Sequence, residues 1–472
     1  MNYELRTMNS DLIIIGAGPG GYRAAAHAAQ HGLKVVIFEG ANVGGTCLNE
    51  GCIPTKSMAR NAEIVQTLKE GSLFGLDNLH YDFNFAQVIA RKNEVLTQLR
   101  SGIDTLLSHP NITLVRSEAR FVDAHTVACS VCGDVIATPA AELYTAPHII
   151  VATGSVSKQL RLKEPASRPV LDSADLLQID HLPKSLCIIG AGVIGMEFAS
   201  IFNAFGTEVT VVEFLKECLP ALDSDIAKRL RKVLEKRGVV FNLQCGVTAI
   251  TPDGVTFTNK KGKEETVQAE DVLMAVGRAP RVQDHFQNAG FEYDARTGIK
   301  VDDNYETTVP GVYAIGDVNS RMMLAHAAEM QGIYVVERIL SEGMAQPNAS
   351  LSSLHASLQT VPAAIFTNPE AACVGMTEDQ LKDGGIAYEC HKAFHRANGK
   401  ALAMNETEGM LKLLSEPDAG RILGCHAFGA HAADMVQEVS ALMCRQTTVA
   451  QLRSMVHIHP TLSEILLTAA EA

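Results

Sequence analysis

The fold of this chain is decided by a glycine-rich stretch near the N-terminus, Leu12-Ile13-Ile14-Ile15-Gly16-Ala17-Gly18-Pro19-Gly20-Gly21. The four apolar residues predict a short buried strand, and the alanine-rich run at 22–31 predicts a helix after the turn. Gly16 permits the tight turn, Gly18 lets backbone approach a pyrophosphate, and Gly21 allows close helix packing. This order of strand, turn and helix predicts a dinucleotide site with the phosphate at the helix N-terminus.

A glutamate completes the pattern. The next predicted strand, 34–38, ends at Glu39, which stands 21 positions after Gly18. A carboxylate at the end of this strand can accept hydrogen bonds from ribose hydroxyls. The alternative is a glycine-rich turn followed by an unrelated surface glutamate.

The same pattern recurs 174 residues later. A predicted strand at 186–189 leads into Gly190-Ala191-Gly192-Val193-Ile194-Gly195, and Glu213 again follows the middle glycine by 21 positions. Two complete units predict two doubly wound domains and two bound dinucleotides. Glu213 would bind a free 2′-hydroxyl and repel a 2′-phosphate, which favours NAD over NADP. The alternative is a site in which the positive charge of the nearby Lys216 offsets the negative charge of Glu213.

Two cysteines follow the first unit, within Gly44-Gly45-Thr46-Cys47-Leu48-Asn49-Glu50-Gly51-Cys52-Ile53-Pro54-Thr55-Lys56. An ideal helix would separate Cα atoms five positions apart by about 8–9 Å, whereas a disulfide tolerates about 7 Å. A bridge therefore requires irregular backbone, which Gly51 helps to supply. Pro54 suits the first turn of a helix, so Cys52 is predicted near a helix N-terminus that would favour its thiolate. From spacing alone, redox chemistry, buried structural thiols and half of a metal site all stay open.

Composition limits the function classes. At 472 residues, with 47% hydrophobic and 20% charged residues, the chain predicts a globular protein of two to four domains. Its net charge of −13 argues against a nucleic-acid surface and favours small molecules or basic proteins as partners. No apolar run is long enough to span a membrane. Eleven cysteines without an export signal predict a cytoplasmic protein.

Three further features carry weaker signals. Cys129 and Cys132 form a CxxC without a second CxxC to complete a zinc site, so we predict a structural role for them and no bound metal. The predicted strand at 311–316 ends at Asp317, which could reach ribityl hydroxyls or simply cap a helix. Residues 1–10 are predicted to be irregular, and Met8 is a possible alternative start.

The C-terminal segment, from about residue 351, has a pattern of strands followed by helices that predicts an α+β domain. Near its end, His459 and Glu464 could form a base held in one tautomer by a carboxylate. The competing interpretation is a capping box of Thr461 and Glu464 before the apolar run 465–467, with His459 on the surface.

Together these motifs resemble the flavoprotein pyridine nucleotide-disulfide oxidoreductases over nearly the whole chain. Within that family, residues 44–56 and His459-Pro460-Thr461-Leu462-Ser463-Glu464 are more similar to dihydrolipoamide dehydrogenases than to glutathione reductases. The C-terminus lacks the cysteine pair of mercuric reductases. The presence of both Cys47 and Cys52 argues against a soluble transhydrogenase.

The resemblance implies an α/β fold with two Rossmann-like dinucleotide-binding domains and a C-terminal α+β dimerisation domain. The implied domains are an FAD-binding domain at 1–153 and 281–350, an NAD-binding domain at 154–280 and an interface domain at 351–472. It also implies a homodimer.

The resemblance further implies roles for individual residues. Cys47 would exchange with the substrate and Cys52 would face the flavin, while Lys56 and Glu197 would form an ion pair beneath the flavin. His459, oriented by Glu464, would be the base for the disulfide of the other subunit. The implied FAD residues are Gly16, Gly18, Gly21, Glu39, Lys56, Asp317 and Ala325, the last within the segment 324–327 at the ring edge. The implied NAD residues are Gly190, Gly192, Gly195, Glu213 and Gly277. Arg281 departs from the family, which usually has asparagine there.

The activity implied is oxidation of protein-bound dihydrolipoamide to lipoamide, with NAD as acceptor, through FAD and a Cys47–Cys52 disulfide. The implied partners are the lipoyl domains and acyltransferase core of a 2-oxo acid dehydrogenase complex, where a basic domain would receive this acidic chain. The alternatives are a flavin reductase for another disulfide, a catalytically quiet flavoprotein subunit, and a thiol metal-binding protein.

Overall fold

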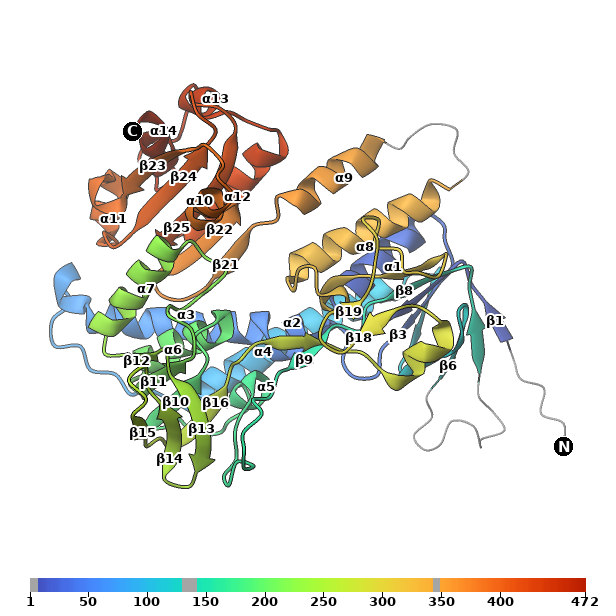
Figure 1. Ribbon diagram of the computed structural model, residues 1–472, viewed down its shortest axis with the longest axis horizontal. Coiled ribbons are helices and arrows are strands. Elements are labelled where there is room, and N and C mark those ends of the chain that lie inside the picture. Colours follow the sequence, from blue (N-terminus) through green and yellow to red (C-terminus); the bar gives the residue numbers. More distant parts are fainter. Residues whose placement is uncertain (1–6, 130–141, 343–348) are drawn as a thin grey trace. The chain divides into compact units, whose positions relative to one another are not determined.

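The computed structural model describes residues 7–129, 142–342 and 349–472 (Figure 1). The chain forms two compact units, each built from three segments. The first comprises Met1–Pro54, Arg91–Ser157 and Arg278–Leu358, and the second comprises Thr55–Ala90, Lys158–Gly277 and Gln359–Ala472. Cys132 lies outside the described residues, so the role predicted for the CxxC pair stays a prediction. Within the described ranges, no helix is long and apolar enough to cross a membrane.

The first unit is organised around a five-stranded parallel sheet in the order β20-β8-β2-β3-β4. Its strands are β2 (Leu12–Ile15), β3 (Val35–Phe38), β4 (Ile112–Val115), β8 (His148–Val151) and β20 (Val312–Ala314). Leu12 and Ile14 pack into one core and Ile13 and Ile15 into another, because successive side chains of a strand point to opposite faces. The sheet is therefore buried on both sides, as its unbroken apolar strands predict.

Two helices cover one face of this sheet. α1 (Pro19–Gln30) and α8 (Ala325–Leu340) lie side by side in Figure 1, and their apolar residues share a core with Leu12 and Ile14. Leu351, Leu354 and Leu358 of α9 (Ala349–Gln359) pack against the same core. The domain limits implied by the resemblance stay predictions.

The other face carries a four-stranded sheet in the order β1-β7-β6-β5. Its strands are β1 (Thr7–Asn9), β5 (Ala119–Asp123), β6 (Thr126–Cys129) and β7 (Leu143–Thr145). The expectation of irregular backbone before Ser10 is wrong for β1, which pairs in parallel with β7. This strand has only three residues and one apolar side chain, the partly buried Met8, so it is too short to show a hydrophobic period in the sequence. The smaller elements of the unit are β9 (Ser155–Ser157) with β17 (Arg278–Pro280), β18 (Tyr293–Asp294) with β19 (Gly298–Ile299), α2 (Gly45–Glu50), η2 (Asp284–Ala289) and η3 (Gly316–Asn319).

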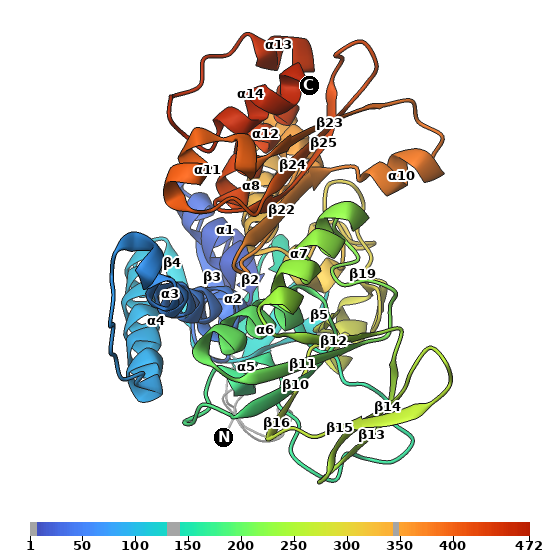
Figure 2. The same ribbon diagram turned by 90° about the vertical axis from the view of Figure 1, so that its left-hand side faces the viewer.

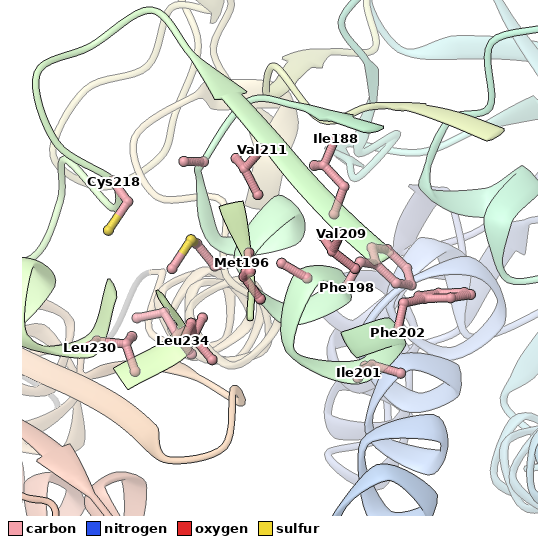
Figure 3. Packing of buried hydrophobic residues seen from close by; sticks show 14 of the residues in the cluster. Ile188, Met196, Phe198, Ile201, Phe202, Val209, Val211, Cys218, Leu230 and Leu234 are labelled. Carbon is pink, nitrogen blue, oxygen red and sulfur yellow. The ribbon is translucent and has the colours of Figure 1, made fainter. Parts of the chain in front are cut away.

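The second unit contains the repeated nucleotide-binding pattern. Its parallel sheet has the order β12-β11-β10-β16, from β10 (Ser185–Ile189), β11 (Glu208–Glu213), β12 (Val240–Leu243) and β16 (Asp271–Met274). Figure 3 shows the core where α6 (Val193–Phe205) and α7 (Ser224–Lys236) meet these strands, with Phe198 and Phe202 near Val209. An antiparallel sheet of β13 (Gly246–Thr251), β14 (Gly254–Thr258) and β15 (Glu264–Val267) packs on the other face (Figure 2). α5 (Ser173–Leu176) precedes β10.

The C-terminal part of this unit is a five-stranded antiparallel sheet in the order β21-β22-β25-β24-β23. The strands are β21 (Ala363–Ile365), β22 (Glu370–Gly375), β23 (Glu389–Phe394), β24 (Met410–Ser415) and β25 (Ile422–Gly429). The accompanying helices are α10 (Glu378–Asp383), η4 (His395–Ala397), α11 (Gly399–Met404), α12 (Ala432–Cys444), α13 (Val449–Arg453) and α14 (Glu464–Glu471). Two Rossmann-like sheets and a C-terminal α+β part confirm the predicted fold class.

Three further helices lie between β3 and β4 in the chain: α3 (Cys52–Lys69), η1 (Gly71–Phe74) and α4 (Phe85–Leu107). Of these helices, α3 begins at the second cysteine of the pair, Cys52.

Candidate active site

The cysteine pair lies at a break between two helices. Cys47 is in α2, Cys52 is the first residue of α3, and Gly51 between them has φ −144° and ψ −111°. A Cβ atom at Gly51 would lie 3.0 Å from the carbonyl oxygen of Thr46, which leaves little room for a side chain. Both expectations for the backbone, an interruption near Gly51 and a helix N-terminus at Cys52, are confirmed. Both cysteines are half-buried thiols in the structure.

A buried asparagine anchors α2, and sequence reasoning did not identify it. The Asn49 amide donates to the carbonyl oxygens of Val43 (3.1 Å) and Gly45 (2.9 Å), and its oxygen accepts from Arg100 Nε at 2.5 Å. Asn49 is 7% exposed, so these bonds form largely out of water. They fix the short helix that carries Cys47.

The first glycine loop has the geometry that a bound dinucleotide requires. Gly16 has φ +104°, and a Cβ there would lie 2.4 Å from the carbonyl oxygen of Ala152. A Cβ at Gly21 would lie 1.9 Å from the carbonyl oxygen of Gly16, so α1 can approach the turn only with glycine at this position. The nearest atom to a Cβ at Gly18 is 3.8 Å away, and no side chain caps α1. The helix N-terminus is left to a phosphate.

The second loop repeats this geometry. Gly190 has φ +105°, and a Cβ there would lie 2.5 Å from the carbonyl oxygen of Ala275. A Cβ at Gly195 would lie 2.0 Å from the carbonyl oxygen of Gly190. Gly192 has open space around its Cβ position, and no side chain caps α6. Both loops therefore fit a dinucleotide pyrophosphate.

The two glutamates are held in equivalent ways. Glu39 accepts hydrogen bonds from the backbone amides of Ala17 and Ala41, both at 2.9 Å. Glu213 accepts from the amides of Ala191 (2.5 Å) and Leu215 (2.7 Å), and only 8% of the residue is exposed. Each carboxylate thus lies at the end of its strand beside its glycine loop. Lys216 is exposed, on the loop after β11.

Asp317 lies in η3, after β20, and does not cap that helix, whose N-cap is Ile315. Its carboxylate accepts from the hydroxyl of Ser155 at 2.5 Å, and Arg278 Nε donates to the same hydroxyl oxygen at 2.7 Å. Ala325 is the first residue of α8, which has no side-chain cap. Sequence reasoning did not assign Ser155 or Arg278 to this group.

The loop around residue 280 is held mainly by its backbone. Gly277 has φ +101°, and its carbonyl oxygen accepts from the amide of Lys158 at 2.9 Å. Arg281, where the family usually has asparagine, forms a half-exposed ion pair with Glu118 at 3.0 Å. Its amide donates to the carbonyl oxygen of Gly154, so the loop keeps its path without an asparagine side chain.

Lys56 and Glu197 form a two-pronged ion pair. Lys56 Nζ lies 2.9 Å from each carboxylate oxygen of Glu197, whose side chain is 5% exposed. The backbone amide of Phe366 donates to Glu197 at 2.8 Å, and Lys56 Nζ lies 4.7 Å from the centre of the Phe366 ring. The buried carboxylate is thereby satisfied by a cation and an amide. Lys56 follows Cys52 by four residues, one turn along α3.

The structure brings His459 and Glu464 together. His459 Nδ1 lies 2.9 Å from Glu464 Oε1, and Glu464 Oε2 accepts from the amide of Thr461 at 2.9 Å. The Thr461 amide, and then His459, hold the pKa of the Glu464 carboxyl below its ordinary value. The complete capping box does not form, because Ser463 is the N-cap of α14 and the Thr461 hydroxyl donates to the carbonyl oxygen of Ile458. The His459 side chain is 79% exposed.

These features define a class of protein. A thiol pair at a helix N-terminus, two dinucleotide loops and a histidine–carboxylate pair together define a dithiol oxidoreductase that uses two dinucleotides.

The comparisons with known proteins agree with this class. A family model described as pyridine nucleotide-disulphide oxidoreductase matches residues 10–332, and the dimerisation domain of that family matches residues 361–470. The chain belongs to the pyridine nucleotide-disulphide oxidoreductases. Its cofactors are therefore FAD and a nicotinamide dinucleotide, and the dimerisation domain supports a homodimer.

Several relatives match almost the full length. The chain is 35% identical over 464 residues to a dihydrolipoyl dehydrogenase of Mycoplasma pneumoniae, with 97% of each chain covered. It is 36% identical over 468 residues to that of Geobacillus stearothermophilus, with 98% of this chain and 96% of the relative covered. Among solved structures, it resembles the copper(II) complex of the HOCl-induced flavoprotein disulfide reductase RclA from Escherichia coli. That match has a TM-score of 0.84 and 28% identity, and covers 98% of this chain and 99% of the other.

Proposed function

We propose that this protein oxidises protein-bound dihydrolipoamide to lipoamide with NAD⁺ as the acceptor, using FAD and a redox-active Cys47–Cys52 disulfide. The observation that carries the proposal is the placement of the two thiols on either side of the helix break at Gly51. The relatives named dihydrolipoyl dehydrogenase are 35–36% identical to this chain, whereas the flavoprotein disulfide reductase is 28% identical. The higher identity favours dihydrolipoamide as the substrate.

The domain limits proposed are those implied by the motifs. FAD binds residues of 1–153 and 281–350, NAD binds within 154–280, and residues 351–472 form the dimer interface. The FAD site uses the first glycine loop, Glu39, Asp317, Ala325 and Lys56. When bound, FAD supplies the redox chemistry that links a two-electron dithiol to hydride transfer to nicotinamide.

The substrate half-reaction is a thiol–disulfide exchange carried by this chain's own residues. His459 Nε2 accepts a proton from one dihydrolipoamide thiol, and the resulting thiolate attacks Cys47 Sγ. The Cys47–Cys52 bond breaks, and Cys52 leaves as a thiolate, which the N-terminus of α3 stabilises. The second substrate thiol then attacks the sulfur bonded to Cys47. Lipoamide is released as a cyclic disulfide, and Cys47 leaves as a thiol that takes the proton of the second substrate thiol.

Glu464 orients His459. Its hydrogen bond to Nδ1 leaves Nε2 to face the substrate, and its negative charge stabilises the imidazolium formed by proton transfer. His459 would act on the disulfide of the second subunit of a homodimer. Val456 and Ile458, on either side of His457, are 98% and 79% exposed, which suits a segment that a second copy covers.

The second nucleotide site is proposed to prefer NAD. Glu213 is buried and anchored by two backbone amides, so it cannot easily withdraw from a 2′-phosphate. A phosphate there would face an adjacent carboxylate, whereas a 2′-hydroxyl would donate a hydrogen bond to it.

The proposed setting is a 2-oxo acid dehydrogenase complex in the cytoplasm. The net charge of −13 suits docking on a basic domain of an acyltransferase core, with lipoyl domains delivering the substrate. Salt should weaken this docking.

A subunit-mixing experiment tests the proposed site. Cys47→Ser and His459→Ala are each expected to be inactive with dihydrolipoamide, because each removes one half of every site. Equal mixing with subunit exchange should restore about a quarter of wild-type activity, because half of the dimers are mixed and each has one intact site. No recovery, with subunit exchange demonstrated, would contradict a site shared between subunits. Faster turnover of glutathione disulfide than of lipoamide would instead select the related disulfide reductase.

A further inference from the structure

A second cluster of metal-ligating side chains lies on the α1–α8 pair of the first unit. His27 and His31 of α1 and its C-cap are four residues apart, and Glu337 comes from the last turn of α8. One ligand atom from each side chain lies within 4.8 Å of the other two. Residues four apart on a helix lie on the same face, so both imidazoles point towards the same neighbourhood.

Close packing of α1 against α8 fixes the spacing between these ligands. A Cβ at Gly332 would lie 2.7 Å from the carbonyl oxygen of Gly20 and 3.1 Å from Ala24 Cβ, and a Cβ at Gly20 would lie 2.9 Å from the carbonyl oxygen of Ala328. The helices can approach this closely only because both positions are glycine. Preorganised ligands lower the cost of forming a metal site.

The hydrogen bonds around the cluster orient its side chains. His31 Nδ1 lies 2.8 Å from the carbonyl oxygen of His27, which fixes the proton on Nδ1 and the lone pair on Nε2. A hydrogen bond of this kind orients most metal-binding histidines. His27 Nε2 lies 2.7 Å from Glu337 Oε1, and the hydroxyl of Ser350 donates to the other carboxylate oxygen at 3.3 Å.

The distances are close to those that a tetrahedral ion imposes. Zinc bonds of about 2.0–2.1 Å place neighbouring ligand atoms about 3.3 Å apart. The His27–Glu337 contact of 2.7 Å needs to widen slightly, by a small shift of those two side chains. The longest separation, within 4.8 Å, needs to shorten, and the exposed His31 side chain can rotate to shorten its own distances. An ordinary ion pair would account for the contact between His27 and Glu337, but it would not account for His31, which lies one helical turn after His27.

We propose that His27, His31 and Glu337 bind a divalent transition-metal ion such as Zn²⁺, with water in the remaining position. Imidazole and carboxylate together suit zinc, and three protein ligands leave one position open. The ion would join the C-terminal end of α1, the helix that begins at the first dinucleotide loop, to α8. Its predicted effect is to stabilise the FAD-binding unit, since an ion that binds only the folded state raises stability.

Zinc binding to the FAD-loaded dimer tests this proposal, by calorimetry with Zn²⁺ alone and by X-ray absorption at the zinc edge. We expect one ion per chain with only nitrogen and oxygen ligands. His31→Ala and Glu337→Gln should each weaken binding by about 10-fold or more. His355→Ala, which removes an exposed histidine of α9 in the same unit, is the matched control and should leave affinity unchanged.

The outcomes are separable. Sulfur ligands in the absorption spectrum would assign the ion to cysteines and overturn the proposal, as would equal affinity in wild type and His31→Ala, or no zinc binding. Flavin content and the thermal midpoint without zinc check that each variant folds. A zinc-dependent rise in that midpoint in wild type, absent in His31→Ala, would support the proposed clamp between the helices.

Discussion

Gly192→Ala separates nucleotide binding from folding. Gly192 has φ −75° and ψ −173°, a conformation open to alanine, and a Cβ there would meet no atom within 4 Å. The substitution should therefore change the stability of the protein by no more than about 0.5 kcal/mol. The methyl group would instead occupy the space through which a pyrophosphate approaches the N-terminus of α6.

The expected loss falls on NAD affinity. Displacing the phosphate from one backbone amide removes a hydrogen bond to a charged group, worth about 1.5–3 kcal/mol. At 1.4 kcal/mol per tenfold change, the dissociation constant for NAD⁺ should rise about 10- to 100-fold. Calorimetry on the FAD-loaded protein measures this change, and a thermal melt checks the fold.

Two other glycines provide the controls. Gly102→Ala in α4 also meets open space but lies outside both loops, so it should leave NAD affinity unchanged. Gly195→Ala would place a Cβ 2.0 Å from a backbone oxygen and should destabilise the protein itself. Unchanged NAD affinity in Gly192→Ala, or a large fall in its melting temperature, would refute the assignment of this loop.

Three other substitutions test the remaining groups. Glu197→Gln should lower stability by about 2 kcal/mol in chemical unfolding, since it removes the charge that pairs with Lys56; the partial exposure of Lys56 keeps the loss below that of a fully buried pair. Glu63, whose carboxylate forms an exposed ion pair with Arg60, provides the control. An equal loss of stability in Glu63→Gln would contradict the role of burial. Glu213→Ala should reduce the ratio of kcat/KM for NAD to kcat/KM for NADP by about tenfold or more, which corresponds to a loss of at least 1.4 kcal/mol of discrimination. An unchanged ratio would mean that residues other than Glu213 discriminate between the two coenzymes. For Glu464, the lowered pKa means that the carboxylate is ionised at neutral pH and loses its charge only as pH falls through that lowered value. Turnover of the wild type should therefore show an additional acid step, due to the Glu464 carboxylate, that is absent from the slower Glu464→Gln variant. Profiles of identical shape would exclude this coupling.

The repeated fold was predictable because each unit combines independent local signals. Two apolar strands, a glycine turn and a glutamate at fixed spacing all specify one structure, and β2 and β10 fall within a residue of their predicted limits. β1 was missed because a three-residue strand with a single apolar side chain is too short to show a hydrophobic period.

The candidate site was only partly predictable. The break at Gly51 followed from helix geometry, but the pairing of Lys56 with Glu197, 141 positions away, came from family resemblance alone. The amide of Phe366 could not be found, because a backbone donor has no sequence signature. His27 and His31 show helical spacing in the sequence, yet their third ligand is 310 positions from His27 and is identified only by the packing of α8 on α1.

The most direct test of the central claim is anaerobic NADH formation from dihydrolipoamide by the FAD-loaded enzyme, compared with the Cys47→Ser variant. The wild-type enzyme should form one NADH for each lipoamide released. Cys47→Ser should bind FAD and NAD⁺ normally but lose at least about 10³-fold in kcat, because the sulfur that the substrate attacks is absent. Wild-type turnover in Cys47→Ser would contradict the account.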